Sequence, residues 1–565
     1  MRILLIKVFF IVFFFGLEAR LFYWQVVKAE YLQSKAEEQH FIAVKVGARR
    51  GNIFFTDGAI LASTSPSFLL FGQPKLIGSD QRVKTGYLLA KTVAQKEEEV
   101  DDLAKDFINK LSQDLYWVLL KRNISVDQKK QIENLNLAGI GFEQESSRFY
   151  PEGSSSAHLL GFVGFDAKGD HKGYFGIEGF YDGELKGVAG KLRHEKDALG
   201  LPILIGDFLS SSAKNGKDLV LHIDRSVQFI VEQSLKNGLE RYGAKAASAV
   251  VMDPKSGAIL ALASFPNYDP QKYADFPKEY YKNPIVADQY EPGSTFKIIV
   301  LSAALNEDIV KPDTRCDICS GPISLGGFLI RTWNNQYFPD TTIKDVIIHS
   351  DNTGMVFTGE KLGLDKFYEY LENFGFGQST DVDLQDESTP EIKPKNSWRE
   401  IDLATASFGQ GIAVTAIQMI RAVSALANGG NLMEPHVVRL IKDEQGSFEI
   451  KPKVIRQVIK DSTASEIREM MKAAVEEGEA KFFKPKGFKI AGKTGTSQIP
   501  VAGHYEPNKT IASFVGFAPY DNPKFAMLIR YDQPSSSIYG SETAAPTFFE
   551  IAKQLFNYYK IAPNE

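Results

Sequence analysis

Three short motifs in a fixed order constrain this chain more than any other feature of its sequence. They are Ser294-Thr295-Phe296-Lys297, Ser350-Asp351-Asn352 and Lys493-Thr494-Gly495-Thr496. Each is weak evidence alone, because Ser-x-x-Lys is frequent on helix surfaces and Lys-Thr-Gly is an ordinary strand-and-turn sequence. The first two motifs begin 56 residues apart (294 to 350), and the last two begin 143 residues apart (350 to 493). Only a folded domain can bring such distant side chains into one site.

The first motif contains the residues that a serine nucleophile needs. A serine hydroxyl attacks poorly until a base removes its proton, and a lysine is a base only while it is neutral. Ser294 follows Glu-Pro-Gly and precedes an apolar run at residues 298–305, which predicts the start of a buried helix. Positions i and i+3 share a helix face, so we expect Lys297 near the Ser294 hydroxyl, with a pKa lowered by burial. In isolation the motif would equally suit a helix cap and a surface lysine, but the other two motifs favour the catalytic interpretation.

The second motif follows an apolar stretch at residues 346–348, which predicts a helix that ends in a loop at the site. A hydroxyl at Ser350 can relay a proton between Lys297 and a leaving amine, and the Asn352 amide can bind a substrate peptide group. For Asp351 we expect a role in structuring the loop instead of direct chemistry.

The third motif lies in residues 488–497, whose composition predicts a strand that faces the site. Lys493 and the hydroxyls of Thr494 and Thr496 can hold a substrate carboxylate, and Gly495 lets the backbone approach it. Part of the lysine excess just before the motif is expected to be a solvated face, yet it suits an anionic substrate. These lysines are Lys481, Lys484, Lys486 and Lys489.

Further blocks give the chain a family resemblance over nearly its whole length. It resembles the class B penicillin-binding proteins, monofunctional peptidoglycan D,D-transpeptidases, and most of all their division-type (septal) branch. Besides the three motifs, the resemblance is carried in the N-terminal half by Arg20-Leu21-Phe22-Tyr23-Trp24-Gln25, Ala48-Arg49-Arg50-Gly51-Asn52-Ile53, Arg148-Phe149-Tyr150-Pro151 and Gly176-Ile177-Glu178-Gly179. In the C-terminal half it is carried by Asp253-Pro254-Lys255-Ser256-Gly257, Ser407-Phe408-Gly409-Gln410-Gly411 and Ser513-Phe514-Val515-Gly516-Phe517.

The resemblance implies an α+β and α/β multidomain fold. We expect a membrane anchor at residues 1–27, a β-rich non-catalytic pedestal of the dimerisation type at 28–212, and a serine β-lactamase-like transpeptidase domain at 213–565. It implies Ser294 as nucleophile, Lys297 as base, Ser350 and Asn352 as relay and substrate ligand, and backbone N–H groups of Ser294 and Thr496 as the oxyanion hole. Lys493, Thr494, Gly495 and Thr496 form the implied carboxylate site. Neither a cofactor nor a metal is expected.

The same resemblance implies cross-linking of stem peptides that end in D-Ala-D-Ala, at division, through an acyl-enzyme that β-lactams trap. The expected partners are a multi-pass glycan polymerase and division proteins. No acidic motif of a glycosyltransferase precedes residue 210, so the chain is expected to cross-link glycan strands and not to polymerise them. A net charge of −5 gives no indication of nucleic-acid binding.

The start of the chain indicates where it works. Residues 3–17 are apolar apart from Lys7, and apolar character resumes at residues 21–27 after Glu18 and Arg20. Such a segment spans a bilayer only if its flanks extend to the interfaces. A cleaved signal peptide is the alternative, but no small-x-small site follows. We therefore expect a single-pass anchor with Arg2 inside and the catalytic domain outside the cytoplasmic membrane.

The two cysteines, Cys316 and Cys319, are spaced C-x-x-C. In an exported protein a short-loop disulfide is the leading interpretation, with free thiols next. A zinc site would need two further ligands, and no HExxH or similar cluster supplies them.

The remaining pattern predicts the order of elements. We expect a polar helix at residues 28–45, extended segments at 46–75, a helical insertion at 86–136 and a linker near 210–217. A helix near 225–242, two strands around residues 253–257 and a closing helix at 548–558 should belong to the catalytic domain.

Other proteins use a similar site. A common type of β-lactamase has Glu-x-x-Leu-Asn between the second and third motifs, and residues 369–373 lack that pattern. A β-lactam sensor needs a cytoplasmic effector, for which the short segment before the apolar core leaves no room. A D,D-carboxypeptidase or an elongation-type transpeptidase stays open; joining an added amine to the product, instead of water, would separate transpeptidase from carboxypeptidase.

Overall fold

The computed structural model describes residues 2–195, 209–501 and 504–563. Met1 of the predicted anchor, residues 196–208 of the predicted pedestal, and residues 502–503 and 564–565 of the predicted transpeptidase domain lie outside these ranges. The chain divides into two compact units. One comprises Met1–Arg50 with Lys186–Gly216, and the other comprises Gly51–Leu185 with Lys217–Glu565.

The first unit contains the N-terminal helices and a small antiparallel sheet. Its elements are α1 (Arg2–Phe22), the π-helical turn η1 (Tyr23–Val27), α2 (Ala29–His40), β1 (Phe41–Val46), β8 (Gly190–Glu195) and β9 (Leu209–Ser211), with strand order β1-β8-β9. The polar helix predicted at residues 28–45 is confirmed as far as His40, where β1 follows. Ser210 and Ser211 belong to β9, so the predicted linker is wrong there because these residues pair with β8.

No helix within the described residues is both long enough and apolar enough to be identified as a membrane span.

In the second unit, a seven-stranded sheet joins strands from distant parts of the sequence. It runs β17-β16-β10-β2-β3-β4, and β5 also pairs with β3. The strands are β2 (Ile53–Phe54), β3 (Ile60–Gly72), β4 (Val118–Ile124), β5 (Ile140–Phe149), β10 (Asp218–Leu221), β16 (Val438–Asp443) and β17 (Gly446–Glu449). The sheet thus combines extended segments predicted for the pedestal with strands that lie beyond residue 212.

A helical insertion interrupts this sheet, as predicted for residues 86–136. It contains α3 (Arg82–Val93), α4 (Val100–Leu111) and α5 (Val126–Asn134), with β4 before α5. Helix α4 buries Ala104, Phe107 and Leu111, whose spacing of three and four residues defines one helix face. The insertion therefore has its own apolar core.

Arg148 joins three of the family-like blocks of the N-terminal half. Its Nε donates to Glu178 Oε1 at 2.6 Å, and its Nη1 donates to the carbonyl oxygen of Gly51 at 2.6 Å. The two side chains are only 3% and 0% exposed. Because a charge this deeply buried requires a partner, the ion pair fixes how the three blocks meet.

The C-terminal half is built on a five-stranded antiparallel sheet with order β12-β11-β21-β20-β19. Its strands are β11 (Ala246–Met252), β12 (Ile259–Phe265), β19 (Ala491–Val501), β20 (His504–Ala518) and β21 (Phe525–Asp532). The two strands predicted around residues 253–257 are β11 and β12. Among the described strands, β19 forms one edge of this sheet.

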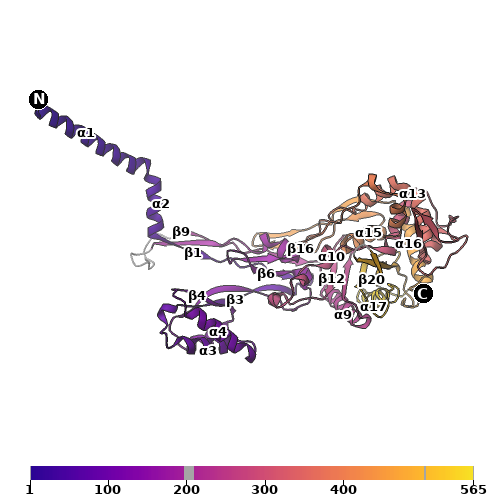
Figure 1. Cartoon of the computed structure of the whole chain (residues 1–565), viewed down its shortest axis with the longest axis horizontal. Helices are drawn as coiled ribbons and strands as arrows, with labels where there is room; N and C mark the ends of the chain where they lie inside the picture. The colour runs from indigo at the N-terminus through magenta and orange to yellow at the C-terminus, as the bar shows by residue number, and fades with distance from the viewer. Residues whose placement is uncertain (1, 196–208, 502–503, 564–565) are drawn as a thin grey trace. The chain divides into compact units, whose positions relative to one another are not determined.

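Alternation along the strands separates two cores, because successive side chains point to opposite faces. Val251 belongs to the core that includes α9 (Arg225–Tyr242) and α17 (Ala544–Tyr558), whereas Val250 belongs to the core that includes α11 (Lys297–Asn306). Figure 1 shows α9 and α17 next to the sheet that contains β12 and β20. The helix predicted near residues 225–242 is confirmed, and the closing helix begins at Ala544, earlier than predicted.

We expect Arg148→Ala to destabilise the second unit strongly, because it leaves the Glu178 carboxylate buried without its partner. The loss should be about 3–5 kcal/mol, measured by urea denaturation. Arg225→Ala is the control, since Arg225 is 54% exposed where it pairs with Glu152 and its loss should cost about 1 kcal/mol or less. Equal effects of the two variants would contradict this account.

Candidate active site

The first motif forms a tight turn at the start of α11. Residues Gly293–Phe296 form a 3₁₀-helix, η6, and α11 begins at Lys297. The start of a buried helix predicted here is confirmed, and its first turn is 3₁₀ before α11 continues. In a 3₁₀-helix residues i and i+3 eclipse each other, so Ser294 and Lys297 lie on the same side of the turn. Ser294 is half-buried, and Lys297 is fully buried.

Lys297 is joined to the second motif by three hydrogen bonds. Its Nζ donates to the Ser350 carbonyl oxygen at 2.6 Å, to Asn352 Oδ1 at 2.8 Å and to Ser350 Oγ at 3.3 Å. Burial, and after it the nearby positive charge of Lys493, lower the pKa of Lys297 from 10.5 to about 7. The Asp351 and Glu479 carboxylates raise the same pKa. Near neutral pH this amine is therefore able to exchange a proton.

The second motif is held between two helices. Helix α12 (Ile343–Ile348) ends just before Ser350, and Asp351 is the N-cap of α13 (Asn352–Asn373). Asp351 Oδ1 accepts hydrogen bonds from the backbone N–H groups of Thr353 at 2.7 Å and Gly354 at 3.3 Å. The predicted structuring role of Asp351 agrees with this cap, whereas the predicted loop is short because Asn352 already starts a helix.

Two features hold the polar groups of the second motif in place. Ser350 has φ = 55°, a left-handed conformation that is uncommon outside glycine and persists only where its surroundings impose it. Asn352 donates from Nδ2 to the Arg331 carbonyl oxygen at 2.8 Å, and this bond directs its Oδ1 to Lys297. The backbone and the amide of this motif are thus both used to hold the lysine.

The third motif lies on the edge strand β19, as predicted. Lys493 Nζ donates to Thr494 Oγ1 at 3.0 Å, and Thr496 Oγ1 accepts the Gly540 N–H at 3.0 Å. A Cβ atom added at Gly495 would lie 2.7 Å from Thr295 Cγ2, so only glycine allows η6 to pack this closely on the strand. The first and third motifs are in direct contact here.

The buried Lys493 is the second cation of the site. Burial lowers its pKa, and the Glu479 carboxylate opposes that shift. The structure therefore brings together all eight residues predicted for the site. Hydrogen bonds join Lys297 to Ser350 and Asn352, and packing of η6 on β19 joins the first motif to the third. Their chemical roles stay predictions.

Sequence reasoning did not include two partners of the third motif. Glu479 Oε2 accepts a hydrogen bond from Thr494 Oγ1 at 3.0 Å, and the Gly540 N–H binds Thr496. An acidic residue directly before the lysine-rich run was the only sequence signal for Glu479. Nothing in the sequence indicates that Gly540 meets β19.

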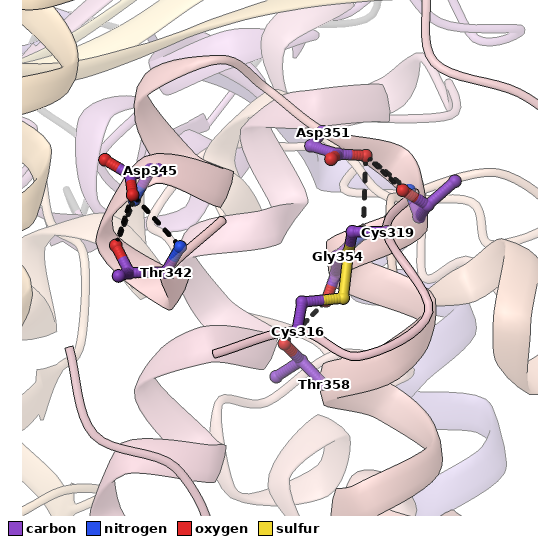
Figure 2. Close-up of a disulfide and its surroundings, with 8 residues drawn as sticks. Cys316, Cys319, Thr342, Asp345, Asp351, Gly354 and Thr358 are labelled. Carbon is purple, nitrogen blue, oxygen red and sulfur yellow. Dashed lines mark hydrogen bonds between the residues drawn. A yellow bond between two sulfur atoms is a disulfide. The ribbon is translucent and has the colours of Figure 1, made fainter. Parts of the chain in front are cut away.

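The predicted disulfide is confirmed. Cys316 and Cys319 are bonded to each other, and both are buried in the core that contains α12 and α13. The Cys316 N–H donates to the Thr341 carbonyl oxygen at 2.9 Å, next to the capping box of α12. Figure 2 shows the disulfide together with Asp351, Gly354 and Thr358 of the start of α13. The disulfide thus closes a short loop in the core that contains α12 and α13, the helices on either side of the second motif.

Two family models match this chain. The penicillin binding protein transpeptidase domain matches residues 247–554, and the penicillin-binding protein dimerisation domain matches residues 45–221. Stage V sporulation protein D of Bacillus subtilis is 35% identical over 100% of this chain and 86% of its own length. Peptidoglycan D,D-transpeptidase FtsI of Escherichia coli is 28% identical over 96% of this chain and 90% of its own length.

Solved structures agree with the sequence matches. A peptidoglycan synthetase from Bifidobacterium adolescentis has a TM-score of 0.72 at 27% identity, covering 93% of this chain and 98% of that one. Penicillin binding protein 3 from Mycobacterium tuberculosis, complexed with aztreonam, has a TM-score of 0.70 at 25% identity, covering 92% and 98%. With a family model over more than half its length and a relative aligned along all of it, this chain belongs to the penicillin-binding proteins and has both their dimerisation and their transpeptidase domain.

Proposed function

We propose that the protein is a serine-type peptidoglycan D,D-transpeptidase that cross-links stem peptides through an acyl-enzyme on Ser294 and is inhibited covalently by β-lactams. The observation that carries the proposal is the fully buried Lys297, whose pKa is lowered to about 7 and which lies one 3₁₀ turn from a half-buried serine. The transpeptidase family match and relatives named as D,D-transpeptidases support it.

The acylation step follows from this arrangement. Neutral Lys297 accepts the Ser294 hydroxyl proton while Oγ attacks the carbonyl carbon of the penultimate D-Ala. Backbone N–H groups of Ser294 and Thr496 are the proposed donors to the oxyanion. The C–N bond to the terminal D-Ala then breaks, and the proton passes from Lys297 through Ser350 to the leaving amine. An acceptor amine attacks the resulting ester and loses a proton to Lys297. The C–O bond to Ser294 then breaks, and Lys297 returns the proton to the Ser294 oxygen.

The third motif is the proposed site for the substrate carboxylate. Thr496 suits this role because its oxygen already accepts the Gly540 N–H, so its own proton is available to an anion. Lys493 supplies the charge. The Thr494 hydroxyl is arranged differently, since its proton is directed to Glu479. Asn352 uses both ends of its amide within the protein, which favours a role in holding Lys297.

The remaining parts of the proposal concern location. We infer a single-pass anchor in α1 and η1, with the catalytic half outside the cytoplasmic membrane. Apolar side chains of α1 are exposed along its length, including Ile3 at 73% and Phe15 at 68%. Division of the chain into an anchor (1–27), pedestal (28–212) and transpeptidase domain (213–565), and action at the division site, follow from the family resemblance.

We expect Ser294→Ala to abolish covalent labelling by fluorescent penicillin, because it removes the attacking oxygen without removing buried volume. Mass spectrometry of the labelled parent should find the adduct on Ser294. Ser302→Ala is a matched control on α11, the helix that follows, since the Ser302 hydroxyl donates to the Ile299 carbonyl oxygen at 2.8 Å. Stoichiometric labelling of Ser294→Ala at another residue would contradict the assignment of Ser294 as the nucleophile.

The acylation rate should depend on pH through Lys297. The base must be neutral, so the rate should rise as pH increases through about 7, the pKa of Lys297, and then stay level until Lys493 loses its charge at alkaline pH. Below the pKa of Lys297 it should fall about tenfold per unit. Stopped-flow acylation by a β-lactam between pH 5.5 and 9 measures this limb. A rate that is constant across pH 6 to 8 would rule out this base, and Lys297→Arg, which cannot lose its proton, should be inactive throughout.

Residues 3–27 are expected to bind a multi-pass glycan polymerase as well as the membrane. Exchanging them for an unrelated apolar helix should reduce co-purification of the full-length protein with the polymerase, because the aromatic side chains of α1 and η1 are lost. Penicillin labelling should be unchanged in the same sample, which serves as the internal control. Undiminished co-purification, or uniform placement along the cell wall, would favour an elongation-type or free-standing enzyme.

A further inference from the structure

A carboxylate outside the three motifs is hydrogen-bonded to the third one. Glu479 follows the C-terminus of α16 (Asp461–Glu477), and its Oε2 accepts a 3.0 Å hydrogen bond from Thr494 Oγ1. Thr494 Oγ1 also accepts the 3.0 Å bond from Lys493 Nζ. A continuous path of hydrogen bonds therefore leads from a fully buried ammonium group to a half-buried carboxylate.

The residue before Glu479, Gly478, packs closely against the end of α12. A Cβ atom added at Gly478 would lie 2.8 Å from the Ile348 carbonyl oxygen and 2.3 Å from that of Ala474. Only glycine lets this turn pack so closely on the end of α12, where the chain passes into Ser350. The backbone of the turn after α16 thus lies against the end of α12, and the Glu479 carboxylate that follows it binds the third motif.

Besides burial, which is the largest cause for both, charges at three positions act on the pKa values of the two lysines. Lys297 of α11 is affected by Lys493 of β19, which lowers its pKa, and by Asp351 at the N-cap of α13 and Glu479 after α16, which raise it. For Lys493, burial lowers the pKa and Glu479 raises it. Glu479 therefore raises the pKa of both lysines, whereas Asp351 raises only that of Lys297.

We propose that Glu479 is a positioning residue that accepts the hydrogen bond of the Thr494 hydroxyl, so that the Thr494 oxygen faces Lys493, and that sets the charge of both active-site lysines without touching substrate. The proposal rests on acylation at Ser294. In this arrangement Glu479 keeps Lys493 cationic, as binding of a substrate carboxylate requires. It also moves loss of the Lys297 proton to higher pH. The pH range in which the enzyme acylates is then set from the turn after α16.

The test is the pH profile of β-lactam acylation in Glu479→Gln. Glutamine keeps the shape and a carbonyl oxygen for Thr494 but removes the charge. Loss of a nearby negative charge lowers the pKa of each lysine, so both limbs of the profile should move to lower pH, each by about half a unit or more. The acid limb reports neutral Lys297, and the alkaline limb reports cationic Lys493.

Two further variants control this experiment. Glu477→Gln removes a neighbouring carboxylate that is 58% exposed and lies 4.0 Å from Lys344 Nζ, and its profile should match the parent. Glu479→Asp draws the charge away from Thr494, so its limbs should lie between those of the parent and Glu479→Gln. If Glu479→Gln does not fold, Glu479→Asp carries the test with the same direction of shift.

A Glu479→Gln profile that superimposes on the parent, or that moves to higher pH, would overturn the proposal. So would the same displacement in Glu477→Gln, because the effect would then not be specific to the Thr494 contact. A parental protein that is not acylated at Ser294 would instead overturn the proposed function, so the two failures are distinguishable.

Discussion

Burial of the Lys297 ammonium group is the constraint on which the site depends. A cation removed from water is costly unless it is hydrogen-bonded or becomes neutral, and here both occur. Three acceptors surround Nζ, two of them on Ser350 and one on Asn352, and the pKa falls to about 7. The same burial that makes the lysine a usable base forces α11, the α12–α13 connection and β19 to meet at one point.

Strand β19 and the start of α13 hold the residues around Lys297 in place. Strand β19 is the sheet edge available to η6, and Gly495 allows the two to touch. The cap formed by Asp351 fixes the start of α13, so the unusual φ of Ser350 is imposed by helices on both sides. Strain is thus concentrated in the residue whose carbonyl oxygen makes the shortest contact with Lys297.

Local spacing predicted much of this site, and contacts between distant elements explain what it could not predict. Ser294 and Lys297 are three residues apart, so any helical turn places them together, and the sequence could not distinguish a 3₁₀ turn from an α-helix. The polar pattern of the second motif indicated the Asp351 cap. Glu479 could not be predicted as a ligand of Thr494, because its position depends on how the end of α16 packs on α12. Likewise, no local pattern predicts that β10 pairs with β2.

That pairing has a consequence for how the two domains of the family are joined in this chain. Strand β10 lies parallel to β2 through Leu219 and Val220, and on its other side it pairs with β16, which follows the helix-rich part of the catalytic half. Removing the chain before residue 213 would expose one edge of β10 and the apolar side chains that β2 covers. Directly after β10, Asp224 caps α9, which packs against the catalytic sheet. The sheet therefore joins strands from before residue 212 to strands beyond it through backbone hydrogen bonds, and β10 connects this sheet directly to α9.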